Sequence, residues 1–99
     1  MIIYIAGKMT GLENKGRKHF DAAEKRLKKL GHIVFNPAHL PDGLSNKDYM
    51  SIGTVMIDIS DAIYALDNWK ESPGAIIEIS YANYTGKKII YEGVNDSEL

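Results

Sequence analysis

Residues 2–11 read IIYIAGKMTG, a short run of β-branched and other apolar residues followed by a segment with two glycines. A nearly continuous apolar run of this length is typical of a strand that is covered on both faces of a parallel sheet. Gly7 ends the run, and residues 8–11 are predicted to form a loop. The chain is therefore expected to begin with a central strand that leads directly into a loop.

The residues that follow alternate between helical and strand patterns. Apolar residues three and four apart predict helices over residues 14–30 and 46–60, and a Ser-Pro start signal at Ser72 predicts a third over residues 72–84. The apolar stripe of the first consists of Phe20, Ala23, Leu27 and Leu30, and the residues expected to face inward in the second are Tyr49, Ile52, Met56 and Ile59. Further strands are predicted over residues 32–36, 62–66 and 87–92, with a loop at residues 67–71 and a frayed segment over the last seven residues.

The order β-α-β-α-β-α-β implies parallel strands joined by right-handed crossovers. The expected fold class is α/β, a Rossmann-like or flavodoxin-like three-layer sandwich with a mostly parallel four-stranded sheet, formed by residues 1–99 as a single domain. Ligands of such sheets bind beyond the carboxyl ends of the strands, near the point where the strand order reverses. Three segments are predicted to share that edge: residues 7–11, 36–45 and 67–74.

Composition excludes several classes of function. Twelve basic and thirteen acidic residues give a net charge of -1, so we expect no binding to polymeric nucleic acid or to a membrane surface. The chain has no cysteine, and its three histidines show no metal-ligand spacing, so neither a metal site nor a cofactor is expected. No apolar run is long enough to span a membrane and no charged leader is visible, which predicts a cytoplasmic protein.

The start of the third predicted helix is the first candidate ligand site. Ser72 and Pro73 have the properties of an N-cap and a first helical residue. The free N–H groups of a helix N-terminus suit a phosphate or carboxylate, and Gly74 and Ala75 leave space for a ligand to approach the backbone. The alternative is that Ser72 only caps the helix.

Glu78 is the unusual residue of the same helix. It lies on one stripe with Ala75 and Ala82, among isoleucines. A carboxylate in that setting is either held near a ligand or a solvated helix residue, and partial burial would raise its pKa.

Other candidate residues are weaker. The loop that contains Gly7, Met9, Thr10 and Gly11 matches neither a dinucleotide-binding nor a P-loop motif and indicates only a close approach of backbone to a neighbouring group. Asp67 and Trp69 follow the third predicted strand, where an aromatic ring has three alternatives: stacking on a nucleobase, covering the edge of the core, or contacting another subunit.

The same positions resemble a known family. The residues that carry the resemblance are YIAGKMTG (4–11), Gly31-His32, Asn36-Pro37, SDAI (60–63) and WKESPGA (69–75), followed by Glu78 and Ala82. They closely resemble an uncharacterised bacterial and phage family described as nucleoside 2-deoxyribosyltransferase-like, over nearly the whole chain. At greater distance the chain resembles the nucleoside 2-deoxyribosyltransferases and the 2′-deoxynucleoside 5′-phosphate N-hydrolases.

The resemblance implies roles for several residues. Glu78 matches the glutamate that attacks the anomeric carbon of the sugar, and Tyr4 matches the tyrosine that orients it. Ser72 lies six residues before Glu78, as does the serine that contacts the 5′-phosphate in the nucleotide hydrolases. The implied ligand is a nucleoside or nucleotide, with Ser72 favouring the phosphorylated form. Relatives complete their pockets with a neighbouring subunit, which implies a homodimer or a larger homo-oligomer.

One position departs from the enzymes. They carry an aspartate eight residues before the residue that matches Asp61, and this chain has Gly53 there. Asp58 and Asp67 are the alternatives for that acid, although neither has the matching spacing. Three hypotheses follow: an enzyme that cleaves or transfers the N-glycosidic bond of a (deoxy)nucleoside 5′-monophosphate; a catalytically weak or inactive module that senses or sequesters a nucleotide; and a structural accessory protein with a vestigial pocket.

Overall fold

Four parallel strands form one sheet in the order β2-β1-β3-β4. The computed structural model describes residues 1–99, except for the side chain of Glu98. The strands are β1 (Ile2–Ala6), β2 (Ile33–Phe35), β3 (Ala62–Ala65) and β4 (Lys88–Tyr91). The helices that connect them are α1 (Arg17–Lys29), α2 (Asn46–Ile59) and α3 (Pro73–Tyr84).

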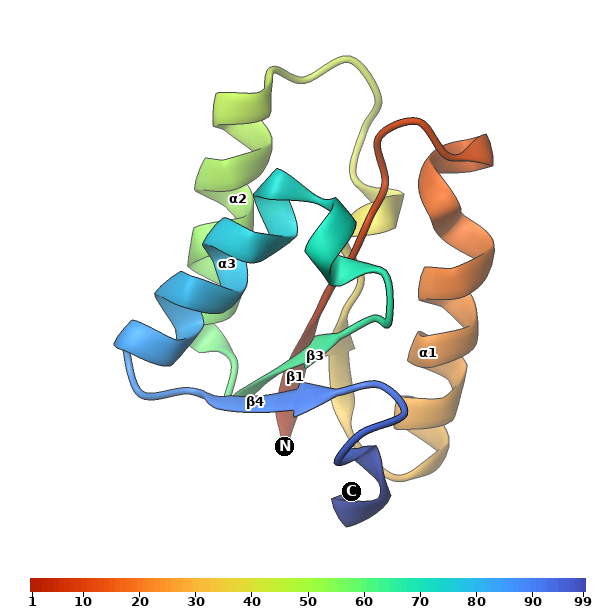
Figure 1. Ribbon diagram of the computed structural model, residues 1–99, viewed down its shortest axis with the longest axis vertical. Helices are drawn as coiled ribbons and strands as arrows, with labels where there is room; N and C mark the ends of the chain where they lie inside the picture. Colours follow the sequence, from red (N-terminus) through yellow and green to blue (C-terminus); the bar gives the residue numbers. More distant parts are fainter.

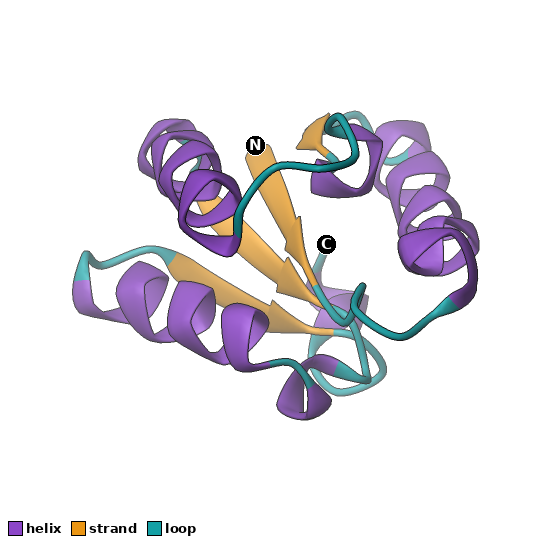
Figure 2. Ribbon diagram, turned by 90° about the horizontal axis from the view of Figure 1, so that it is seen from above, coloured by secondary structure: helices purple, strands orange, loops and turns teal.

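The helices cover the sheet on both faces. Figures 1 and 2 show α1 on one face and α2 and α3 on the other. The central strands β1 and β3 are almost completely buried between these layers, which explains their continuous apolar sequences. The predicted three-layer α/β sandwich is therefore confirmed, and the sheet is entirely parallel. The strand order reverses between β1 and β3, so the expected ligand edge lies beyond the ends of these two strands.

Alternation along β1 assigns its side chains to two separate cores. Ile3 and Ile5 pack on the α1 side with Phe20, whereas Tyr4 and Ala6 pack on the side of α2 and α3. Tyr4 is only 1% exposed. Its phenol ring is thus enclosed by the sheet and two helices, where its hydroxyl group requires a hydrogen-bond partner.

Two predicted helices differ from the structure in their details. The first begins at Arg17, because Asn14 and Lys15 have φ angles of 48° and 59° and form a separate 3₁₀ turn. Leu30 caps the C-terminal end and is 48% exposed, so its predicted place in the apolar stripe is wrong. In α2 the buried residues are Gly53 and Ile57, one turn apart, and Met56 packs against the same core, as predicted.

Ile59 is 54% exposed, and its predicted inward position is also wrong. It lies about 200° around α2 from Ile57, on the opposite side of the helix. The segment predicted as a loop at residues 67–71 also contains a 3₁₀ turn, Trp69–Glu71. Within the described residues, no helix combines the length and the apolar character that crossing a membrane requires.

The C-terminal segment is ordered by side-chain contacts, which makes the predicted fraying wrong. Arg26 Nη1 donates to Asp96 Oδ2 over 2.9 Å, and the Tyr64 hydroxyl donates to the same oxygen over 3.1 Å. Asn95 Oδ1 accepts from the backbone N–H of Tyr91 at the end of β4. Arg26 and Tyr64 lie far from Asp96 in the sequence, so hydropathy along the last residues gives no sign of these contacts.

We expect Asp96→Ala to lower the free energy of unfolding by about 1–2 kcal/mol, because it removes the acceptor shared by Arg26 and Tyr64. Thermal unfolding followed by circular dichroism measures the effect as a fall of several degrees in Tm. Ser97→Ala, an exposed neighbour, is the matched control. Equal Tm values for Asp96→Ala and the wild type would contradict an anchored C-terminus.

Candidate functional site

Glu78 extends from α3 towards the central strand β1. The Tyr4 hydroxyl donates a hydrogen bond of 2.6 Å to Glu78 Oε2. The two residues are separated by 74 positions in the sequence, and each supplies the partner that the other needs in a largely apolar setting. The predicted catalytic pair is therefore in direct contact, on the side of the sheet that α2 and α3 cover.

Gly53 of α2 lies beside both Glu78 and the Tyr4 hydroxyl group. A Cβ atom at position 53 would lie 2.5 Å from Glu78 Oε2 and 3.1 Å from the Tyr4 hydroxyl oxygen. The missing side chain thus leaves the volume that the carboxylate uses. Tyr4, Gly53 and Glu78 are called the Glu78 cluster below. The sequence singled out Gly53 as a departure from relatives, but not as a neighbour of Glu78.

Burial determines the charge state of the cluster. Burial raises the pKa of Glu78 to about 7, although the hydrogen bond from Tyr4 acts in the opposite direction because it favours the carboxylate. Burial, followed by the negative charge of Glu78, raises the pKa of Tyr4 well above its ordinary value. At neutral pH Tyr4 is consequently a neutral donor, and Glu78 is divided between the acid and the carboxylate.

The two oxygens of Glu78 differ in their surroundings. Oε2 accepts the bond from Tyr4, whereas Oε1 has no hydrogen-bond partner within the described residues. Every fully buried side-chain oxygen or nitrogen among the described residues has a hydrogen-bond partner. Glu78 itself is half-buried. Oε1 is therefore not completely enclosed by the protein.

The N-terminus of α3 has the geometry predicted for it. Ser72 Oγ accepts a bond of 3.1 Å from the backbone N–H of Ala75, and Pro73 occupies the first turn. This cap leaves the Ser72 hydroxyl proton free to donate. A Cβ atom on Gly74 would lie 3.9 Å or more from its neighbours, the closest of which are Ser72 Oγ and Met50 Cε. Ser72 and Glu78 are six positions apart, which along a helix is a rise of roughly 9 Å.

Close packing at Gly7 and a positive φ angle at Gly11 account for the glycines of the first loop without a ligand. A Cβ atom on Gly7 would lie 2.6 Å from a side-chain carbon of Leu66, so the glycine lets the ends of β1 and β3 pack closely. Met9 packs against the core on the α1 side, away from Tyr4. Thr10 and Gly11 are exposed, and Gly11 has a φ angle of 81°.

Asn68 connects this loop to the end of β3 by accepting a bond of 3.0 Å from the backbone N–H of Lys8. Trp69, in the turn that follows, packs against Tyr91 with ring centroids 5.6 Å apart. A hollow beside them is lined by Ala65, Asp67, Trp69, Lys70, Tyr91, Glu92 and Val94, and shares no lining residue with the Glu78 cluster. The predicted site residues therefore fall into separate groups.

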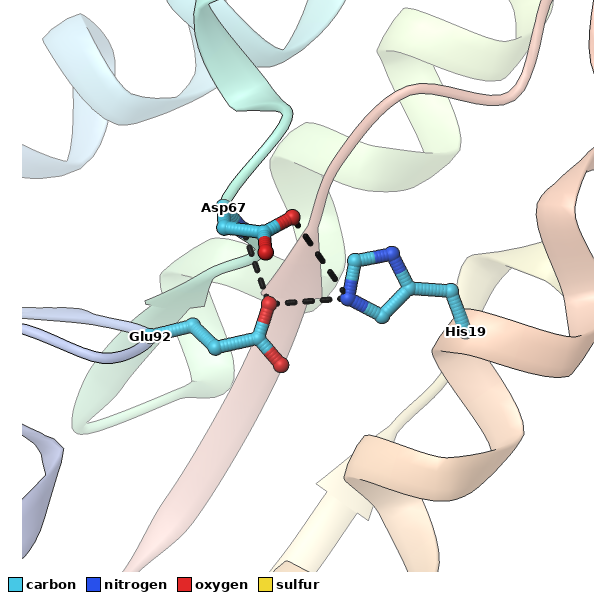
Figure 3. A group of neighbouring side chains, drawn as sticks. All are labelled: His19, Asp67 and Glu92. Atoms are coloured by element: carbon cyan, nitrogen blue, oxygen red, sulfur yellow. Dashed lines mark hydrogen bonds and ion pairs between the residues drawn. The ribbon is translucent and has the colours of Figure 1, made fainter.

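A further polar group escaped the sequence analysis. Figure 3 shows His19 of α1 facing Asp67 and Glu92, which follow β3 and β4. His19 Nε2 and the backbone N–H of Asp67 both lie 2.8 Å from Glu92 Oε1, and His19 Nε2 lies 3.8 Å from Asp67 Oδ1. Imidazole and carboxylate are metal-ligand types, yet hydrogen bonds already join these three residues. Ligand spacing along one element cannot reveal them, because they come from three elements.

Neither aspartate considered as the missing acid contacts the Glu78 cluster through a hydrogen bond. Asp58 Oδ1 accepts from the Tyr81 hydroxyl on α3, and the Asp58 carbonyl accepts from Lys87 Nζ. Asp67 belongs to the group around Glu92. Within the described residues, Tyr4 is the ionisable side chain that contacts Glu78.

Solved structures with the same fold include two proteins whose names state an activity. The CMP N-glycosidase BcmB of Clostridium botulinum superposes with a TM-score of 0.69 at 25% sequence identity, covering 92% of this chain and 70% of that protein. A 2-deoxyribosyltransferase of Leishmania mexicana superposes with a TM-score of 0.74 at 21% identity, covering 91% of this chain. This chain spans 62% of that transferase.

No curated protein sequence matches the chain. A family model, described as a domain of unknown function, DUF4406, matches residues 1–91. The match covers most of the sequence and includes every residue of the Glu78 cluster. The chain therefore belongs to the DUF4406 family and has the nucleoside 2-deoxyribosyltransferase-like fold.

Proposed function

We propose that this protein cleaves or transfers the N-glycosidic bond of a (deoxy)nucleoside 5′-monophosphate, with Glu78 as the nucleophile. The observation that carries the proposal is the 2.6 Å hydrogen bond between the Tyr4 hydroxyl and Glu78 Oε2, which holds one carboxylate oxygen and leaves Oε1 without a protein partner. Structural similarity to a CMP N-glycosidase at 25% identity supports the same class of reaction.

In the proposed reaction, Glu78 Oε1 attacks the anomeric carbon of the sugar. The C–N bond breaks, the base leaves with the bonding electron pair, and a glycosyl ester of Glu78 forms. Water then attacks that carbon in a hydrolase, or an acceptor base does so in a transferase, and Glu78 is released. The transition state has oxocarbenium character, which a nearby carboxylate stabilises. Tyr4 orients the carboxylate through its hydrogen bond.

The proposed ligand carries a 5′-phosphate, held by the N-terminus of α3. The free backbone N–H groups and the hydroxyl proton of Ser72 are suited to an anion, and the helix dipole adds a partial positive charge. Because Ser72 and Glu78 belong to one helix, their relative position is rigid. The remaining predicted contacts, from Gly7, Met9, Thr10, Gly11, Asp67, Trp69, Gly74 and Ala75, stay predictions.

A second candidate function is a nucleotide-binding module with little or no turnover. The observation that favours it is Gly53, which supplies no acid for the leaving base, while Asp58 and Asp67 are hydrogen-bonded elsewhere. The homodimer and the cytoplasmic location also stay predictions.

Glu78→Gln is expected to reduce base release by roughly 10³- to 10⁶-fold, since the amide keeps the shape of the side chain and an acceptor for Tyr4 but is no nucleophile. Free base released from a panel of nucleoside and deoxynucleoside monophosphates is measured by chromatography. Glu24→Gln on α1, on the other face of the sheet, is the matched control. Persistent release by Glu78→Gln would contradict the proposed nucleophile, and tight binding without release by the wild type would favour the module.

Ser72→Asp separates phosphate recognition from capping. Aspartate is as good an N-cap as serine, but it adds a negative charge where the phosphate is proposed to bind. We expect the Kd of a nucleotide to rise roughly tenfold or more, with little change for the matching nucleoside, as measured by titration calorimetry. Ser72→Thr, which keeps the hydroxyl group, is the control. Equal weakening for both ligands would argue against a phosphate contact.

Ionisation of Glu78 should destabilise the fold as the pH rises. The pKa of Glu78 is about 7 in the folded protein and 4.5 as an ordinary glutamate, so the folded state keeps a proton that the unfolded state loses between these values. The difference in the free energy of unfolding between the wild type and Glu78→Gln is therefore most favourable to the wild type below pH 4.5. It falls by on the order of 2–3 kcal/mol as the pH rises through 7. Urea unfolding of both proteins at pH 5 and pH 8 measures this difference, and parallel pH profiles would refute it.

A further inference from the structure

Gly53 lies at a position where glycine is unfavourable unless something requires it. It is buried in the middle of α2, where an alanine would lose less conformational entropy on folding. Its φ angle is not in the left-handed region that favours glycine, unlike the φ angles of Gly43 and Gly86. Backbone conformation therefore does not explain this residue, and the explanation has to come from its surroundings.

The surroundings of Gly53 are the polar atoms of the Glu78 cluster. The Cβ position of residue 53 lies 2.5 Å from Glu78 Oε2, 3.1 Å from the Tyr4 hydroxyl oxygen and 3.7 Å from Glu78 Cδ. The first of these distances is too short for non-bonded atoms, so the carboxylate occupies part of the volume that any other residue needs. Gly74 in α3 differs, since its Cβ position meets nothing closer than 3.9 Å.

We propose that Gly53 is a positioning residue, whose missing side chain provides the space in which the Glu78 carboxylate is held against Tyr4. Its catalytic meaning rests on the function proposed above, but the steric claim does not. With Tyr4 on one side and the α2 backbone on the other, Oε2 has a defined position. A side chain at position 53 would force Glu78 out of this space and break its bond to Tyr4.

The proposal also explains why an aspartate at position 53 is incompatible with this arrangement. An aspartate there would add its Cβ atom, and a second negative charge, beside Glu78 Oε2. Gly53→Asp is therefore expected to displace Glu78 rather than to supply an acid. The departing base must then receive its proton from a source other than residue 53.

A double-mutant cycle tests the steric claim without any substrate. Thermal unfolding is measured for the wild type, Gly53→Ala, Glu78→Ala and the double variant. We expect Gly53→Ala to lower Tm when Glu78 is present and to raise it by a few degrees when Glu78 is replaced by alanine, because the helix then gains from alanine without a clash. Gly74→Ala, with room for its methyl group, should not lower Tm in either background. Equal shifts for Gly53→Ala in both backgrounds would overturn the proposal.

The titration of Glu78 gives a second readout, which a general loss of stability would not move. Tyr4 from β1 is the ionisable group that faces Glu78, and α2 presents the uncharged Gly53 to it. Carboxyl ¹³C chemical shifts should show a midpoint of about 7 in the wild type and a lower midpoint, towards 4.5, in Gly53→Ala, where the carboxylate moves into water. An unchanged midpoint would overturn the proposal.

The two proposals fail separately. Coupling between Gly53 and Glu78 in the cycle, with no base release by the wild type, would refute the enzyme and leave the positioning role intact. Base release that depends on Glu78 but has the same pH profile in Gly53→Ala as in the wild type would refute the positioning role and leave the enzyme intact.

Discussion

The hydrogen bond between the Tyr4 hydroxyl and Glu78 joins the central strand of the sheet to the helical layer that covers one of its faces. Tyr4 is buried in the central strand, so its hydroxyl group needs a partner inside the core, and Glu78 on α3 supplies it over 2.6 Å. The carboxylate in turn needs space, which α2 provides at Gly53. A polar contact within an otherwise apolar core thus links β1 to α3 beside α2.

Burial changes the chemical properties of this carboxylate as well as its structural role. The same surroundings that raise the pKa of Glu78 to about 7 also hold one of its oxygens in place and leave the other without a protein partner. A carboxylate that is costly to ionise inside the fold is a stronger base and nucleophile than one in water. In the proposed reaction, stability and reactivity are thus coupled through one side chain.

The polar groups of the two sheet faces have different roles. On the α1 side, His19, Asp67 and Glu92 join α1 to the ends of β3 and β4, and Arg26, Tyr64 and Asp96 hold the C-terminal segment. These groups connect elements at the margin of the sheet. On the side of α2 and α3, the Glu78 cluster lies against the middle of β1, next to the point where the strand order reverses.

Sequence alone determined the order and type of the elements, because apolar runs and helical spacing record which residues a sheet or a helix buries. It also predicted the cap at Ser72 and singled out Glu78, since each is a local feature of α3. Only tertiary structure decided what Glu78 touches, why residue 53 is glycine, that Ile59 faces outward and that Asp96 is anchored. Periodicity reports the apolar side of an element, whereas a polar contact depends on atoms brought together from residues as distant as 4 and 78.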